Sequence, residues 1–190
     1  ILVNVFICLN TANAAKREIS IIHTNDLHSH FLGFSPNQDY TPDTVQDDDT
    51  IGGWARISTM IKQIKAQSNG PVLVLDGGDF LMGSFFHLLS REKAFELELL
   101  GKMGYDAVTL GNHEFDLKPK GLAQILDAAQ KHDTRPAILI SNIVFSEESA
   151  EDDSLEQAYS TGRIKPYTII EKDGVKFGIF GLMGKDAAEK

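Results

Sequence analysis

Three short apolar segments of this chain each end in a polar motif. The segments are residues 18–24, 72–75 and 107–110, and the motifs after them are Asp26-Leu27-His28, Gly77-Gly78-Asp79 and Gly111-Asn112-His113. Runs of this length are typical of β-strands, and the unbroken run at 72–75 fits a parallel strand covered on both faces. Ligands of open α/β sheets bind beyond the carboxyl ends of the strands. We therefore expect the three motifs to meet at one edge of a single sheet.

The segments between and after these strands complete the expected order. Apolar residues recur at helical spacing in residues 53–67, 91–102 and 118–131. Three further strands are predicted at 137–140, 167–171 and 175–182, the last two around an Asp-Gly turn typical of a hairpin. The predicted core-facing stripes are Ile57, Met60, Ile61 and Ile64 in the first helix and Leu122, Ile125, Leu126 and Ala129 in the third. Alternating strands and helices with a terminal hairpin predict an α/β fold.

The side chains of the three motifs are of the kinds that bind transition metals. The motifs contribute the carboxylates of Asp26 and Asp79, the imidazoles of His28 and His113, and the amide of Asn112. Carboxylate oxygen and imidazole nitrogen hold Mn, Zn, Fe or Co in hydrolytic sites. The glycines of the same motifs permit sharp turns and close backbone approach. The sequence therefore predicts a hydrolase that activates water with metal.

The net charge of the chain limits the classes of substrate that it is expected to bind. The chain has 190 residues and a formal net charge of −9, which argues against a protein that wraps nucleic acid. The acidic runs at 43–49 and 147–153 are expected to be solvated loops. A small phosphorylated substrate stays compatible with this acidity, because bound metal ions would be the largest local charges in the site.

The first 15 residues have the pattern of an export signal. The apolar run at 1–9 is too short to span a bilayer of about 30 Å, and Ala12-Asn13-Ala14 fits a signal-peptidase site. We expect cleavage after Ala14, export to a bacterial periplasm or the medium, and no stable membrane insertion afterwards. Cys8 is the sole cysteine and would leave with the signal. A buried first strand is the alternative interpretation of this segment.

Longer matching stretches around the motifs carry a family resemblance. The chain resembles the calcineurin-like metallophosphoesterases, and within them the N-terminal domain of the 5′-nucleotidase and UDP-sugar hydrolase family. The matching stretches are residues 23–30 (HTNDLHSH), 52–56 (GGWAR), 75–79 (LDGGD) and 104–116 (GYDAVTLGNHEFD). The resemblance runs from about Ile19 to the end of the chain. It implies a layered α/β/β/α sandwich, incomplete at the C-terminal side.

The resemblance also implies a set of metal ligands. Asp26 and His28 would ligate the first of two divalent metal ions, Asp79 would bridge both, and Asn112 would ligate the second. The identity of the metal, whether Mn, Zn, Co or Fe, stays open. Two metals about 3.5–4 Å apart can share a hydroxide at neutral pH and clamp the oxygens of an in-line displacement.

A catalytic pair is implied beside these ligands. His113 would be an imidazole that does not bind metal, and Asp116 would orient it and raise its pKa. Asp116 could instead cap the helix that begins near Lys118. The substrates implied are 5′-nucleotides or nucleotide sugars. A cyclic nucleotide or a sulfur ester on the same scaffold, or a non-catalytic metal- or nucleotide-binding remnant, are the alternatives.

The family pattern also contains histidines beyond the last one found here. No histidine follows His132, so residues 16–190 are expected to be the N-terminal part of a catalytic domain. Of the other polar residues near the motifs, Glu114 is expected to be structural and Asp76 to hydrogen-bond locally. We expect His23 to be buried within its strand and His30 to line the pocket or support the ligands.

Overall fold

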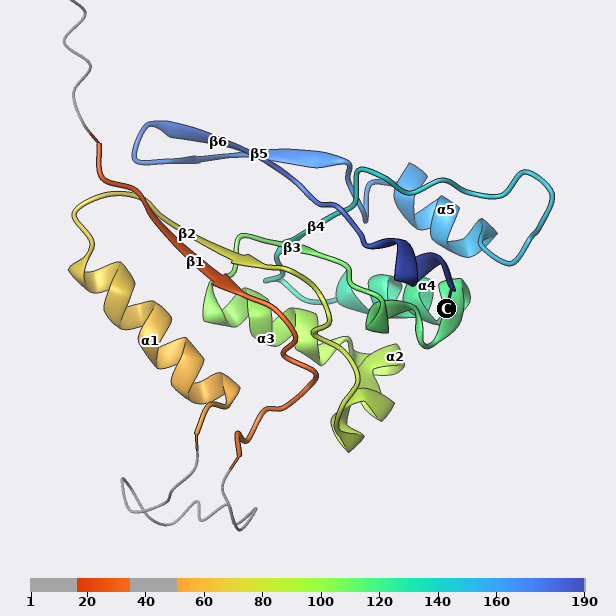
Figure 1. Ribbon diagram of the computed structural model, residues 1–190, viewed down its shortest axis with the longest axis horizontal. Helices are drawn as coiled ribbons and strands as arrows, with labels where there is room; N and C mark the ends of the chain where they lie inside the picture. The colour runs from red at the N-terminus through yellow and green to blue at the C-terminus, as the bar shows by residue number, and fades with distance from the viewer. Residues whose placement is uncertain (1–16, 35–50, 190) are drawn as a thin grey trace, which may run out of the picture.

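The computed structural model describes residues 17–34 and 51–189 of the chain (Figure 1). The predicted export signal at 1–15 and the acidic run at 43–49 lie outside the described residues. Within the described residues, no helix combines the length and the apolar character that a membrane span requires.

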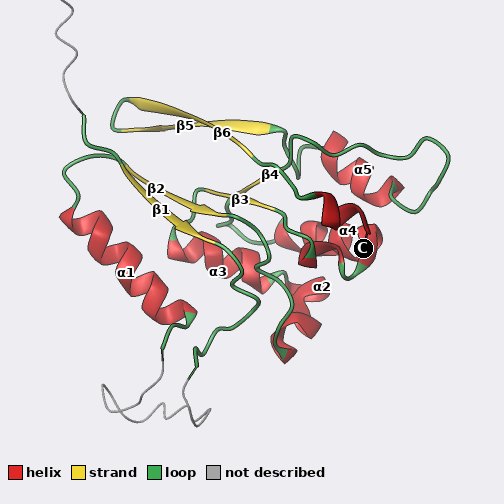
Figure 2. Ribbon diagram, in the orientation of Figure 1, coloured by secondary structure: helices red, strands yellow, loops and turns green. Residues whose placement is uncertain are grey.

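A four-stranded parallel sheet forms the centre of the fold (Figure 2). Its strands are β1 (Ser20–Thr24), β2 (Val72–Asp76), β3 (Ala107–Thr109) and β4 (Ala137–Leu139), and they lie side by side in sequence order. Every neighbouring pair is parallel, so all four carboxyl ends lie at the same edge. This arrangement confirms the α/β class and places the ends of β1, β2 and β3 next to one another.

Three helices cover one side of this sheet, and the hairpin lies on the other side (Figure 1). The helices are α1 (Trp54–Gln67), α3 (Phe95–Met103) and α4 (Lys118–Ala129). The predicted stripe of α4 is confirmed, because Leu122, Ile125, Leu126 and Ala129 are all buried. The stripe of α1 is only partly correct, since Ile61 is buried whereas Met60 is 59% exposed.

The predicted helix at 91–102 is two helices. Helix α2 (Ser90–Lys93) follows the 3-10 turn Phe85–Leu89 and ends at Ala94, and α3 begins at Phe95. Ala94 has a left-handed φ of 45° and is fully buried. The break lets Glu96 turn inward, where its carboxylate accepts hydrogen bonds from the Ser90 hydroxyl and from the hydroxyl of the distant Ser29. A tertiary contact therefore overrides the local preference for a continuous helix.

The hairpin is confirmed, and its turn has the expected chemistry. Strand β5 (Tyr167–Lys172) pairs antiparallel with β6 (Val175–Phe180). Asp173 and Gly174 both have positive φ, which the tight hairpin turn requires. Lys172 attaches the hairpin to the parallel sheet, since its ammonium lies 2.6 Å from Oδ2 of Asp106.

One expectation about burial is wrong, and one helix was not predicted. His23 is exposed, because β1 pairs only with β2 and the face it shares with Ile21 is open among the described residues. Helix α5 (Asp153–Ser160) was not predicted. Its signal was present as Leu155, Ala158 and Tyr159 at helical spacing, directly after the acidic run. A last 3-10 turn spans Lys185–Glu189.

Candidate metal centre and catalytic pair

The pairing of β1 with β2 continues beyond both strands. The amide of Asp26 donates to the carbonyl of Gly78 at 3.0 Å, and the amide of His28 donates to the carbonyl of Asp79 at 2.9 Å. Asp26, His28 and Asp79 all have φ between 45° and 56°, a region that non-glycine residues rarely adopt. Strain of this kind clusters at functional sites. The two motifs are thus fixed side by side by main-chain bonds.

The second and third motifs touch backbone to backbone. Gly78 has a φ of 100°, and a Cβ built there would lie 2.4 Å from the backbone nitrogen of Gly111. A side chain at Gly78 would therefore push the two turns apart. This close approach explains why the motif after β2 requires glycine at this position.

Glu114 joins these two turns through hydrogen bonds to their main chain. Its carboxylate accepts hydrogen bonds from the amides of Asp79 (2.9 Å), Leu81 (3.0 Å) and Gly111 (2.7 Å). The side chain is fully buried, and this burial raises its pKa to about 7. The expected structural role of Glu114 is confirmed, because one carboxylate satisfies amides from both turns.

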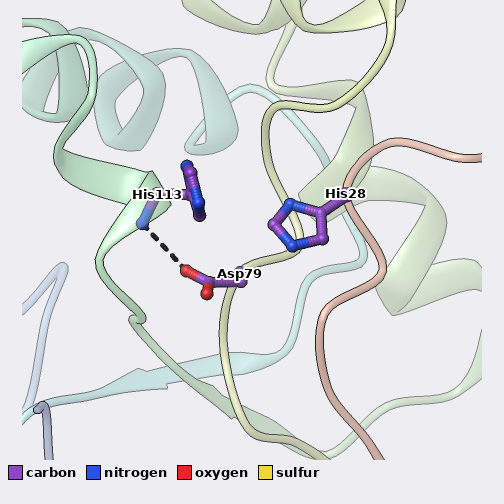
Figure 3. Close-up of side chains that lie close together, drawn as sticks. All are labelled: His28, Asp79 and His113. Carbon is purple, nitrogen blue, oxygen red and sulfur yellow. Dashed lines mark hydrogen bonds between the residues drawn. The ribbon is translucent and has the colours of Figure 1, made fainter.

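His28, Asp79 and His113 converge in front of these turns (Figure 3). Each offers one ligand atom, and these atoms all lie within 4.8 Å of one another. The amide of His113 donates to Oδ1 of Asp79 at 2.8 Å, and the two imidazole rings meet edge to face with centroids 5.0 Å apart. Residues from the ends of β1, β2 and β3 thus form one cluster.

Asp26 and Asn112 flank this cluster. Asp26 is not part of the group of three, but its Oδ1 lies 3.6 Å from Nε2 of His28. Its other oxygen is close to the side-chain amide of Asn25. Asn112 directly precedes His113 in the turn after β3, and its carbonyl accepts the amide of Phe115 at 3.1 Å. Both residues lie at the expected edge, on the two sides of Asp79.

The donor set fits a divalent transition metal. Nδ1 of His28 lies 3.2 Å from the carbonyl of Leu81, and a proton shared there leaves Nε2 as the metal-binding nitrogen. Metal-bound histidines usually donate their other N–H in this way. Asp79 uses only Oδ1 to accept the His113 amide, so its second oxygen remains available. Nitrogen and oxygen donors on three adjacent strand ends suit Mn, Fe, Co or Zn.

His113 and Asp116 form a close pair. Nδ1 of His113 lies 2.6 Å from Oδ2 of Asp116. The pair lies in the turn that contains the 3-10 helix His113–Phe115 and precedes α4. Leu117, not Asp116, occupies the N-cap position of α4, and the Leu117 side chain makes no capping hydrogen bond.

A second layer of polar residues supports the turn after β2. Oδ2 of Asp76 accepts the hydroxyl of Thr24 at 2.6 Å, and Oδ1 accepts the amide of Gly78 at 3.0 Å. The Thr24 hydroxyl also lies 2.8 Å from that of Tyr105. Burial is the main cause that raises the pKa of Asp76 to about 6 and that of Tyr105 to about 12. The expected local role of Asp76 is confirmed.

His30 and Glu96 lie close to the His28 turn. His30 is half-buried against Phe34, with ring centroids 4.5 Å apart, and burial together with the neighbouring His28 lowers its pKa. Glu96 accepts a hydrogen bond from the hydroxyl of Ser29, the residue after His28. Sequence reasoning missed Glu96, because a glutamate in a helical segment carries no signal of burial.

Comparison with known proteins agrees with this geometry. Residues 19–172 match the family described as Calcineurin-like phosphoesterase. Snake venom 5′-nucleotidase of Gloydius brevicauda is 36% identical over 173 residues, which cover 91% of this chain and 26% of that protein. A probable 5′-nucleotidase of Treponema pallidum is 32% identical over 173 residues, which cover 90% of this chain and 26% of that protein.

Solved structures show the same likeness. The 5′-nucleotidase precursor from Thermus thermophilus superposes with a TM-score of 0.67 at 28% identity, covering 90% of this chain and 29% of that one. The chain spans about a quarter of the length of the curated relatives it matches. The match over residues 19–172 includes all three strand-end motifs. By that match and by its fold, the chain belongs to the calcineurin-like phosphoesterase family.

Proposed function

We propose that this chain provides metal ligands and a catalytic imidazole to a phosphoesterase that hydrolyses 5′-nucleotides or nucleotide sugars. The observation that carries the proposal is the convergence of His28, Asp79 and His113, with ligand atoms within 4.8 Å, at the carboxyl ends of three adjacent strands. The names of the relatives, which are 5′-nucleotidases, support the substrate class.

The site is proposed to hold two divalent ions. Strand β2 lies between β1 and β3, so Asp79 stands between Asp26 and His28 on one side and Asn112 on the other. This central position suits a carboxylate that bridges two ions. Divalent ions bound there would lower the pKa of a water molecule and neutralise the charge of a phosphate group.

His113 is proposed to act on the substrate and not to bind metal. Oδ2 of Asp116 lies 2.6 Å from its Nδ1, which leaves Nε2 to face the substrate. A protonated Nε2 can donate a hydrogen bond to a phosphoryl oxygen or a proton to the leaving oxygen. The amide bond from His113 to Asp79 fixes the ring beside the metal ligands. The same contact places His113 close to the ligand atoms of His28 and Asp79.

Export is part of the proposal and rests on the sequence alone. The apolar run at 1–9 and the small residues Ala12 and Ala14 support cleavage of a signal peptide. Mass measurement of the amino terminus of the secreted or periplasmic protein would test it. A mature chain that begins near Ala15 is expected, and a mature protein that retains residues 1–14 would contradict it.

Phosphate release is the experiment that tests the function. The protein, expressed at its natural full length, is assayed with AMP and UDP-glucose, with Mn²⁺ added and after removal of metal by EDTA. We expect hydrolysis that needs metal and returns when Mn²⁺ is restored. The proposed phosphoesterase activity would be refuted if the folded, metal-loaded protein hydrolysed neither these compounds nor an activated phosphodiester.

A further inference from the structure

A buried polar cluster contacts the turn that carries His28. It consists of Ser29, Ser90 and Glu96, each with 0% of its surface exposed. Oε1 of Glu96 accepts the hydroxyl of Ser29 at 3.0 Å and the hydroxyl of Ser90 at 2.6 Å. A carboxylate is costly to bury, so its retention at this position calls for a structural reason.

The cluster holds a turn that the chain would not adopt unaided. His28 and Ser29 are consecutive non-glycine residues with φ of 45° and 50°. Such residues persist in this region only where their surroundings fix them. The amide of Ser29 donates to the carbonyl of Phe80 at 3.0 Å, and the hydroxyl of Ser84 donates to the carbonyl of Ser29 at 2.7 Å. The Ser29 hydroxyl lies 3.0 Å from Oε1 of Glu96 and 3.5 Å from the carbonyl of Phe80, so the Glu96 bond is the shorter of its two contacts.

The break at Ala94 serves the same contact. Ala94 follows α2 in a left-handed conformation, and α3 begins at Phe95. The next residue, Glu96, is buried in the cluster. A continuous helix would not hold Ser90 and Glu96, six residues apart, on one face, because residues three or four apart are neighbours on a helix. The interruption therefore brings the Ser90 hydroxyl and the Ser29 hydroxyl to one carboxylate oxygen.

We propose that Glu96 is a positioning residue that fixes the Ser29 turn and thereby directs His28 toward Asp79. The proposal rests on the proposed metal site, because His28 matters there as a ligand. Glu96 acts through Ser29 and does not itself touch the ligand cluster. Its bond to Ser90, a residue of α2, involves no residue of the turn that carries His28. This asymmetry provides a matched control within one cluster.

The test compares Ser29→Ala with Ser90→Ala in the full-length protein. Each variant removes one buried hydroxyl bonded to the same oxygen of Glu96. Two readouts are used: hydrogen exchange of the His28 and Ser29 amides in metal-free protein, and the Kd for Mn²⁺ from calorimetry. We expect Ser29→Ala to accelerate exchange of both amides and to raise the Kd about 10–100-fold, the usual effect of losing a residue that supports a metal ligand. Ser90→Ala is expected to leave the Kd near that of the parent protein, because the bond between Glu96 and Ser29 stays in place.

Substitutions at Glu96, alone and together with Ser29→Ala, form a double-mutant cycle. Glu96→Gln keeps an acceptor oxygen for Ser29 and should remain near the parent protein in both readouts. Glu96→Ala should match Ser29→Ala, and the double variant should be no worse than Glu96→Ala alone in Kd. Equal effects of Ser29→Ala and Ser90→Ala, or no effect of Ser29→Ala, would overturn the positioning role. A Glu96→Ala protein that does not fold leaves the serine comparison decisive.

A failure of the proposed metal site can be distinguished from a failure of the positioning role of Glu96. If the parent protein binds no Mn²⁺, the proposed metal centre is wrong. Amide exchange in the metal-free protein still decides whether Glu96 holds the turn. Faster exchange in Ser29→Ala but not in Ser90→Ala supports it, and equal exchange refutes it.

Discussion

The imidazole of His113 and the carboxylate of Asp116 lie 2.6 Å apart, joined through Nδ1 and Oδ2. The carboxylate side chain is only 17% exposed, against 35% for the imidazole. Because Asp116 occupies Nδ1, Nε2 is the nitrogen that can face a substrate or a metal. The pair therefore fixes the orientation of the ring.

Substitution of His113 by Gln separates a catalytic role from a metal-binding role. We expect kcat on AMP to fall about 10²–10⁴-fold, the usual contribution of a general acid or base, while the Kd for Mn²⁺ stays close to that of the parent. Steady-state kinetics and calorimetry on the same preparation measure both. A Kd that rises in parallel with the loss of kcat would make His113 a ligand instead.

Substitution of Asp79 by Asn should impair metal binding and rate together. Asn keeps an oxygen that can accept the His113 amide, as Oδ1 of Asp79 does at 2.8 Å, but it removes the charge that would bridge two ions. We expect weaker Mn²⁺ binding by at least about tenfold, with loss of most activity. Exposed Asp133 provides the control, because Asp133→Asn changes the same charge away from the site. Unchanged metal affinity in Asp79→Asn would remove the bridging assignment.

Loss of Glu114 should loosen both turns at once. Glu114→Ala leaves the amides of Asp79, Leu81 and Gly111 without their acceptor. Each unsatisfied buried amide costs about 1–3 kcal/mol, so we expect a destabilisation of several kcal/mol in urea unfolding. Glu114→Gln retains one oxygen and should lose less. Equal stabilities of the Ala variant and the parent would show that the turns hold without this carboxylate.

Asp76 should make stability depend on pH. Its folded-state pKa of about 6 lies above its ordinary value of 3.8, so the folded state holds the proton more tightly than the unfolded chain. Stability from this group is present below pH 4 and is lost as the pH rises from about 4 to 6, a change of roughly 3 kcal/mol. Urea unfolding of the parent and of Asp76→Asn across this range should diverge accordingly. Parallel pH profiles would contradict the raised pKa.

The anchor of the hairpin can be tested at Lys172. Its ammonium lies 2.6 Å from Oδ2 of Asp106 and 2.8 Å from the carbonyl of Val72. Lys172→Met removes both bonds and leaves the partly buried Asp106 carboxylate without this salt bridge, with the Val74 amide still donating to it at 2.9 Å, so we expect a loss of about 1–3 kcal/mol of unfolding free energy. Lys176→Met on the exposed side of the hairpin should change stability by less than about 0.5 kcal/mol. Similar losses in both variants would show that charge, and not the anchor, is responsible.

Much of the fold was predictable because its signals are local. The apolar runs, the α4 stripe of Leu122, Ile125 and Leu126, and the Asp-Gly turn of the hairpin each lie within a short window. The break at Ala94 was not predictable in this way, because residues 91–102 have good helical periodicity and one of the two hydroxyls that bind the inward-turned Glu96 belongs to the distant Ser29. The exposure of His23 depends on which strands pair with β1. The residues that surround His23 in the sequence do not carry that information.

From the sequence alone, Asp26, His28, Asp79, Asn112 and His113 can be predicted as candidate site residues, because each follows a recognisable strand in a motif with glycine or a second polar residue. The α/β order is predictable too, since helical and strand periodicities alternate along the chain. Which atoms meet depends on the tertiary structure. The parallel order β1-β2-β3 brings three strand ends together, and main-chain bonds between turns fix their spacing. The buried carboxylates of Glu114 and Glu96 hold these turns through contacts between residues distant in sequence, and such contacts form only once the chain is folded.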